Sequence, residues 1–138
     1  IHDATRPGEI EAALPDRPDA RLVFIGRIRT PFTTRADCPK QPRSDGPPCR
    51  LEIDHPWQPA LEGLKPGDRI EVIYWMHQAC IHAALAREAN PIAVSSVSVI
   101  KAEPGALLVT SLDCVDGTPL LDIKPERCGY SPPRGAAD

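Results

Sequence analysis

The sequence predicts an all-β fold: one compact β-barrel domain with a short helical insertion. The chain of 138 residues is about the length of a single domain. Its 17 prolines are about 12% of the chain, against a typical ~5%. Because proline ends helices and is restricted within strands, so many prolines favour short elements joined by loops. Several segments also alternate apolar and polar residues, which is typical of half-buried strands.

Strands are expected in the first half of the chain at 21–30, 50–54 and 69–76. The first is rich in apolar and β-branched residues and stops at Pro31. The third follows a Pro-Gly turn, and four of its residues share one face: Ile70, Val72, Tyr74 and Met76. Between the first two strands, the proline-rich stretch 31–48 has the length of a functional or disordered loop.

In the second half, the alanine-rich segment 78–89 lacks Gly and Pro and predicts the single helix. Residues 92–100 predict a strand whose apolar alternation slips across Ser95-Ser96, as a β-bulge would require. A strand over 106–113 is followed by Asp116-Gly117, a hairpin signal. The returning strand is expected at 119–124.

These elements divide the chain into an N-terminal arm over 1–20, a barrel domain over 21–125 and a C-terminal tail over 126–138. The longest apolar stretch, 92–100, is interrupted by serines and is far shorter than the about 20 residues that cross a bilayer. We therefore expect no membrane span. The five cysteines form no CxxC pair, and the start lacks a signal-peptide pattern. Reduced thiols in a cytoplasmic protein are the simplest interpretation.

The net charge of −3 does not suggest the strongly basic surface of many nucleic-acid-binding proteins. A local basic patch is still conceivable, and its candidate members lie in the first half of the chain: Arg27, Arg29, Arg35, Lys40, Arg43 and Arg50. The alternative is ordinary solvated charge.

Common catalytic signatures, including glycine-rich nucleotide loops and the nucleophile elbow, are absent. His77, Cys80 and His82 are possible zinc ligands, but they do not share one helical face and no second cluster completes the set. We expect no metal. Asp113, Asp116 and Asp122 could supply a carboxylate pair for acid–base chemistry or could simply cap turns.

The segment 112–125, LDCVDGTPLLDIKP, resembles the closing signature of the TsaA-like family, also called the YaeB or TrmO family. Four earlier segments are similar to family motifs and follow in the same order: GRIRTPF at 26–32, PKQP at 39–42, YWMHQ at 74–78 and NPIA at 90–93. The resemblance covers nearly all of the predicted barrel domain.

This resemblance implies a compact β-barrel that binds S-adenosylmethionine, forms a homodimer and methylates N6 of threonylcarbamoyladenosine in tRNA. The residues that it implies for the cofactor pocket are Lys40, Gln41, Pro42, His77, Gln78, Val94, Leu112, Asp113, Cys114 and Val115. For positioning or deprotonating the target nitrogen, Asp116 is the first candidate and His77 the second. Such a site needs mainly to align the nucleophile with the methyl group.

The chain departs from the family pattern before Asn90, where residues 83–89 replace an arginine-containing stretch. This departure leaves a second hypothesis open, a non-catalytic module of the same fold that binds S-adenosylmethionine or a nucleotide. A third, weaker hypothesis is a small metal-dependent protein that uses His77, Cys80 and His82.

Overall fold

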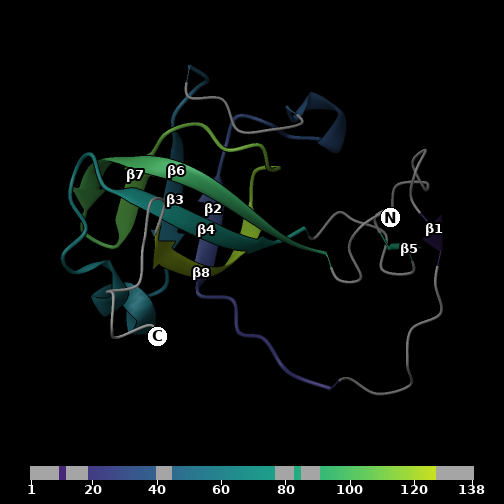
Figure 1. Ribbon diagram of the computed structural model, residues 1–138, viewed down its shortest axis with the longest axis horizontal. Helices are drawn as coiled ribbons and strands as arrows, with labels where there is room; N and C mark the ends of the chain where they lie inside the picture. Colours follow the sequence, from purple (N-terminus) through teal and green to yellow (C-terminus); the bar gives the residue numbers. More distant parts are fainter. Residues whose placement is uncertain (1–9, 12–18, 40–44, 77–82, 85–90, 127–138) are drawn as a thin grey trace, which may run out of the picture.

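A computed structural model of the chain describes residues 10–11, 19–39, 45–76, 83–84 and 91–126. Its centre is a closed barrel of antiparallel strands in the order β2-β3-β7-β6-β4-β8 (Figure 1). The barrel strands are β2 (Gly26–Arg29), β3 (Cys49–Ile53), β4 (Arg69–Trp75), β6 (Ile92–Glu103), β7 (Ala106–Val109) and β8 (Thr118–Pro125). The prediction of an all-β barrel is therefore confirmed.

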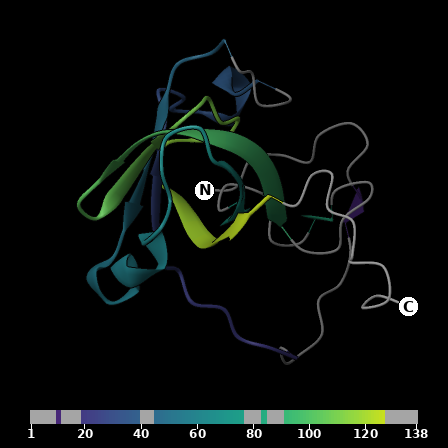
Figure 2. The same ribbon diagram turned by 60° about the vertical axis from the view of Figure 1, so that its left-hand side comes forward.

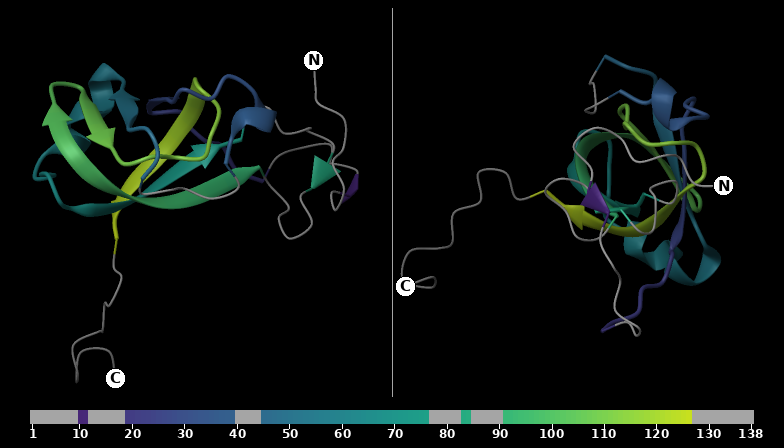
Figure 3. Two further views of the ribbon diagram at one scale, coloured as in Figure 1. Left: turned by 90° about the horizontal axis from the view of Figure 1, so that it is seen from above. Right: turned by 90° about the vertical axis from the view of Figure 1, so that its right-hand side faces the viewer.

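The core fills the barrel interior with one face of each strand. On β4, Ile70, Val72 and Tyr74 are at most 4% exposed, as their predicted common face requires. Figures 2 and 3 show the long β6 curving around the barrel, where it pairs with β4 on one side and β7 on the other. Its curvature helps the sheet close on itself and leaves the barrel without an open edge.

The predicted bulge at Ser95-Ser96 is wrong. The register between β4 and β6 runs without a break from Trp75 opposite Ile92 to Arg69 opposite Ser98. Ser95 keeps the alternation by pointing inward, where its hydroxyl group is hydrogen-bonded to Tyr74. A polar residue thus occupies a core position, and the actual irregularity lies between Val99 and Lys101, against β7.

The predicted hairpin between the strands at 106–113 and 119–124 is also wrong. β7 and β8 are not neighbours, because β8 pairs with β2 and β4 and thereby closes the barrel. The turn itself exists: Gly117 has a φ of +82°, and the Thr118 backbone N–H donates to Val115 O at 3.2 Å. After this turn, β8 therefore runs between β2 and β4 and not beside β7.

Within the predicted helix 78–89, the two described residues form a strand instead. β5 (Ala83–Ala84) pairs with β1 (Ile10–Glu11) in a separate two-stranded sheet. Helix propensity is a weak preference that a pairing partner elsewhere in the chain can override. The rest of the predicted helix lies outside the described residues.

Two 3₁₀ helices not predicted from the sequence are η1 (Arg35–Asp37) and η2 (His55–Leu61). η1 lies in the predicted 31–48 loop, where Thr34 caps it by accepting the Asp37 backbone N–H. η2 is tied to the end of β3 by Gln58 Nε2, which donates to Ile53 O at 3.2 Å. Among the described residues, no helix is long and apolar enough to cross a membrane.

Candidate functional site

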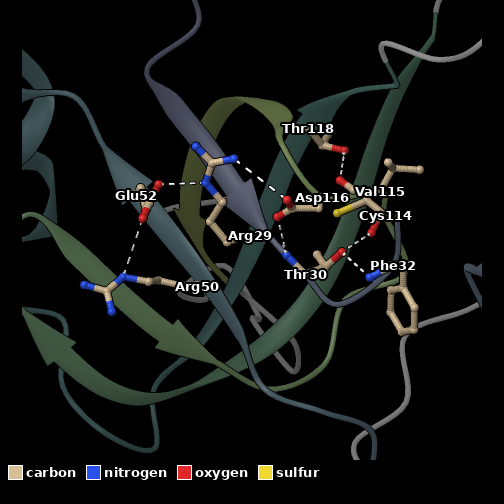
Figure 4. Close-up of polar contacts among 9 residues, drawn as sticks. All are labelled: Arg29, Thr30, Phe32, Arg50, Glu52, Cys114, Val115, Asp116 and Thr118. Atoms are coloured by element: carbon tan, nitrogen blue, oxygen red, sulfur yellow. Dashed lines mark hydrogen bonds and ion pairs between the residues drawn. The ribbon is translucent and has the colours of Figure 1, made fainter. Parts of the chain in front are cut away.

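The segment 110–117, which connects β7 to β8, is fastened to the chain just after β2 (Figure 4). Thr30 Oγ1 donates to Cys114 O at 2.7 Å and accepts the Phe32 backbone N–H at 3.2 Å. The Asp116 backbone N–H donates to Phe32 O at 2.7 Å. The bonds to Cys114 and from Asp116 join two chain regions that the sequence separates by more than 80 residues. They fix the backbone of the signature segment against the start of the 31–48 loop.

Asp116, the first catalytic candidate, is itself part of this fastening. Its Oδ1 accepts the Thr30 backbone N–H at 3.0 Å, and its Oδ2 lies 3.9 Å from an Arg29 guanidinium nitrogen. Both carboxylate oxygens are therefore engaged, although the side chain is 40% exposed. Asp116 thus holds the backbone after β2 and does not cap its own turn through this bond, and a catalytic role for Asp116 stays a prediction. The third acid of the group, Asp122, pairs with Lys124 at 3.1 Å.

Arg29 continues a chain of alternating charges across the outer face of β2 and β3, which Figure 4 shows. Its Nε donates to Glu52 at 2.8 Å, and this hydrogen bond raises the pKa of Arg29. Glu52 also lies 3.8 Å from Arg50, which in turn is 3.5 Å from Glu103. The guanidinium of Arg27 lies 5.5 Å from the ring centre of Phe24. Of the suspected basic patch, Arg29 and Arg50 are thus paired with acidic groups.

A second polar cluster combines Tyr74 on β4, Ser95 on β6 and Asp113 on the 110–117 segment. Tyr74 Oη lies 2.8 Å from Asp113 Oδ1 and 2.9 Å from Ser95 Oγ, and Ser95 Oγ lies 3.3 Å from the same carboxylate oxygen. Because an ionised carboxylate can only accept, the Tyr74 hydroxyl donates to Asp113. Burial, followed by the nearby Asp113 charge, raises the pKa of Tyr74, so its hydroxyl group stays protonated.

A cleft of about 390 Å³ opens where the 31–48 loop meets the 110–117 segment. It is lined by Phe32, Asp37, Pro39, Asp45, Gly46, Pro47 and Ser111. Its volume falls within the range of roughly 300–1,000 Å³ that is usual for small-molecule sites. Two of its described lining side chains, Asp37 and Asp45, carry carboxylates.

The side chains of Leu112, Cys114 and Val115 in the 110–117 segment face the core. Leu112 is fully buried, and Cys114 and Val115 are each 7% exposed. Burial raises the pKa of the Cys114 thiol and, likewise, that of Cys49. Protonated thiols are poor nucleophiles, so neither cysteine is activated for covalent chemistry. Of residues 112–115, Asp113 is the one whose side chain is available for polar contacts.

Several predicted pocket residues lie outside the described residues: Lys40, Gln41, Pro42, His77 and Gln78. Val94 is described, is 55% exposed and lies opposite Ile73. It precedes the inward-facing Ser95, so its side chain points outward and joins neither polar cluster. The possible zinc ligands also lie outside, and the described part of the chain holds no group of three potential metal ligands.

Sequence reasoning missed the participation of Thr30, Tyr74 and Ser95 in these clusters. The sequence predicts Tyr74 as a core residue at the start of the YWMHQ motif and Ser95 as part of a bulge. The available signal was the serine itself, since an uninterrupted alternation places Ser95 inward, where a hydroxyl group requires a partner. The identity of that partner depends on the barrel closing, which a local pattern does not show.

Comparison with known proteins agrees with this geometry. The sequence-family model of the tRNA-methyltransferase O N-terminal domain matches residues 27–89 and 83–127 of this chain. The "Probable S-adenosyl-L-methionine-binding protein VirR" of Rhizobium radiobacter is 42% identical over 88% of this chain and 79% of its own length. An S-adenosyl-L-methionine-binding protein of Archaeoglobus fulgidus is 28% identical over 80% of this chain and 89% of its own length.

Solved structures give the same result for the fold. A crystal structure of TrmO superposes with a TM-score of 0.68 at 30% identity, covering 83% of this chain and 59% of that one. TrmO from Pseudomonas aeruginosa gives the same TM-score and identity over 86% of this chain and 59% of its own. The chain thus spans about three-fifths of these solved proteins. By its barrel and its matching sequence, it belongs to the family of the tRNA-methyltransferase O N-terminal domain.

Proposed function

We propose that this chain is an S-adenosylmethionine-dependent methyltransferase domain whose substrate is tRNA and whose target is N6 of threonylcarbamoyladenosine. The observation that carries the proposal is the cleft, which forms where the 31–48 loop meets the fastened 110–117 segment. Both regions contain residues that the family resemblance implies for the cofactor. The names of the relatives support a cofactor of this kind, and a tRNA substrate would place the protein in the cytoplasm.

The cleft has a volume in the range usual for small-molecule sites. S-adenosylmethionine carries a positive sulfonium, a positive ammonium and a negative carboxylate group, and the described lining includes Asp37 and Asp45. Asp113 follows Ser111, another lining residue, by two positions. When bound, the cofactor supplies a methyl group that the sulfonium makes electrophilic. In this proposal the protein binds and orients the two reactants.

In this proposal, Asp116 and His77 are the groups that position or deprotonate the target nitrogen. Asp116 would act from a fixed place, because Thr30 and Arg29 hold its carboxylate. The backbone of 112–115 and the side chain of Asp113 would contact the cofactor, together with Lys40, Gln41, Pro42, Gln78 and Val94.

Two measurements test this function in sequence. Calorimetric titration of S-adenosylmethionine should give micromolar binding, on the order of −8 kcal/mol. Labelled cofactor should then transfer its methyl group to tRNA that contains threonylcarbamoyladenosine, and not to tRNA prepared without that modification. Absence of binding at millimolar cofactor would contradict the proposal.

The variant Asp116→Asn tests the proposed role of that carboxylate. It keeps the acceptor for the Thr30 N–H but removes the charge, so cofactor affinity should change little while methyl transfer is lost. Full turnover in this variant would show that the Asp116 carboxylate takes no part in methyl transfer and has a structural role only. Asp122→Asn is the matched control, since Asp122 pairs with Lys124 instead.

A second candidate is the non-catalytic module that binds S-adenosylmethionine or a nucleotide. Residues 83–89 in place of the family's arginine-containing stretch favour it. This candidate predicts calorimetric binding of the cofactor without methyl transfer to any tRNA. The two measurements above therefore separate the two functions.

We also propose that the protein forms a homodimer. The support is a set of apolar side chains that are exposed in the isolated chain, including Phe24 at 41% and Val94 at 55%. Light scattering coupled to size-exclusion chromatography measures the mass directly. A mass near 15.0 kDa at micromolar concentration would contradict a dimer.

A further inference from the structure

We infer that Tyr74 and Ser95 are positioning residues, which hold the Asp113 carboxylate so that it can accept a positively charged group of the bound ligand. This inference rests on the proposed function. It assigns roles to Tyr74, the first residue of the YWMHQ motif, and to Ser95, which lies outside the family motifs. It starts from the difference between the two oxygens of Asp113.

One oxygen of Asp113 is held and the other is available. Oδ1 lies 2.8 Å from the Tyr74 hydroxyl and 3.3 Å from that of Ser95. Oδ2 has no hydrogen-bond partner within the part of the chain that the structure describes, and it is not fully buried. Asp116 differs, because both of its carboxylate oxygens are engaged by Thr30 and Arg29. Of these two acids, Asp113 is therefore the one with a carboxylate oxygen available to bind a ligand.

The groups that hold Asp113 come from rigid elements. Tyr74 and Ser95 lie on neighbouring strands of the barrel wall, and both side chains are buried, at 4% and 7% exposure. A strand fixes a side chain more firmly than a loop does. Their hydroxyl groups therefore select one orientation of a carboxylate whose own backbone belongs to a connecting segment. A ligand that binds this carboxylate then loses less free energy to ordering the side chain.

The direction of the hydrogen bonds completes the arrangement. Tyr74 donates its single proton to Asp113, so Ser95 can donate either to Tyr74 Oη or to the carboxylate. Neither hydroxyl group is left without an acceptor. The cluster thus presents a carboxylate that is supported from inside the barrel and has one oxygen without a hydrogen-bond partner among the described residues.

The matching ligand group is a cation, and S-adenosylmethionine offers two. Its ammonium group is shared with S-adenosylhomocysteine, whereas its sulfonium is not. Titrating both compounds therefore distinguishes the two sources of charge. Loss of affinity for both in Asp113→Asn indicates the ammonium group, and loss for S-adenosylmethionine alone indicates the sulfonium.

The test measures the affinity of the whole chain for S-adenosylmethionine by calorimetry in Tyr74→Phe, Asp113→Asn and the double variant. Tyr74→Phe keeps the ring in the core and removes the hydroxyl group. We expect each single variant to bind about tenfold more weakly or worse, which corresponds to about 1.4 kcal/mol. In the Asp113→Asn background, Tyr74→Phe should weaken binding much less than it does alone, because the group that it positions has been altered.

Ser98→Ala is the matched control, since Ser98 lies on the same strand and its hydroxyl group accepts from Arg69 instead. It should bind like the wild type. If Tyr74→Phe fails to fold, Ser95→Ala makes the same test with a smaller change, and its thermal melting reports folding independently.

Two results would overturn the inference alone while the wild type binds. The first is an unchanged affinity for S-adenosylmethionine in both Tyr74→Phe and Ser95→Ala. The second is a double variant whose fold-loss of affinity equals the product of the two single fold-losses, because independent structural damage would give that product. A wild-type chain that does not bind S-adenosylmethionine would overturn the proposed function itself, and the inference with it.

Discussion

Thr30 is the residue on which the attachment of the signature segment most depends. Its hydroxyl group donates to Cys114 O and accepts from the Phe32 N–H, while its backbone N–H reaches the Asp116 carboxylate. Thr30 therefore makes two hydrogen bonds to a connection far along the chain, one through its side chain and one through its backbone N–H. It lies within the GRIRTPF motif, but the family resemblance gave it no role of its own.

Thr30→Val should destabilise the protein by about 1–3 kcal/mol, because it leaves partly buried polar groups without partners. Chemical denaturation measures this loss. Thr30→Ser keeps the hydroxyl group and should recover most of the stability. Equal stability of the valine variant and the wild type would show that solvent replaces these bonds without cost.

The sequence identified the signature acids by type, but their roles depend on neighbours far along the chain. Asp113 meets Tyr74 and Ser95, which precede it by 39 and 18 residues. Asp116 meets Thr30, which precedes it by 86. Turn chemistry suggested that Asp116 caps a local turn, but its carboxylate instead accepts the backbone N–H of the distant Thr30. The different environment of Asp113 arises from pairing between strands, which no local pattern contains.

Among the elements, β2 depends on the absence of a side chain at Gly26. A Cβ atom built there would lie 1.9 Å from the Glu52 carbonyl oxygen on β3, far inside van der Waals contact. Gly26→Ala must therefore push the two strands apart, and we expect a loss of at least about 3 kcal/mol in unfolding free energy.

The matched control is Gly63→Ala. No atom lies within 4 Å of a Cβ built at Gly63, and only its φ of +85° opposes a side chain. This variant should lose about 1 kcal/mol. Denaturation curves of both variants separate the cost of steric overlap from that of the backbone conformation. A smaller loss for Gly26→Ala would mean that β2 and β3 can separate easily.

The predictions of strands and turns succeed where the deciding interactions are close in sequence and fail where they join distant segments. The strand predicted at 69–76 is observed at 69–75, since alternation and a preceding turn act within the strand itself. The hairpin after β7 was wrong because barrel closure, and not the turn, selects the neighbours of β8. The alanine-rich segment failed likewise where Ala83 and Ala84 pair with residues 10 and 11.

For the molecule as a whole, the buried acidic hydroxyl and thiol groups determine the response to alkaline pH. Burial raises the pKa of Cys49, Cys114 and Tyr74 above their ordinary values. Above a pH of about 8.5, the thiols of the unfolded chain lose protons that the folded chain retains. The unfolded state then binds fewer protons, so stability is fully present below this pH and declines as the pH rises.

We expect this decline to approach about 1.4 kcal/mol per pH unit for each thiol involved. Urea denaturation between pH 8 and 10.5 measures it. Cys114→Ala should show a shallower decline despite a lower stability at pH 7. Identical slopes in the variant and the wild type would show that Cys114 does not contribute.

The order of the barrel strands has a consequence for synthesis on the ribosome. β2 and β8, the first and last strands of the barrel along the chain, are direct neighbours, and β8 pairs with β4 on its other side. A nascent chain that ends before Thr118 therefore has two strands with unpaired edges. The ring can close only after the last strand has left the exit tunnel. The interval before release of β8 is accordingly when a chaperone would most protect this chain from pairing with another copy.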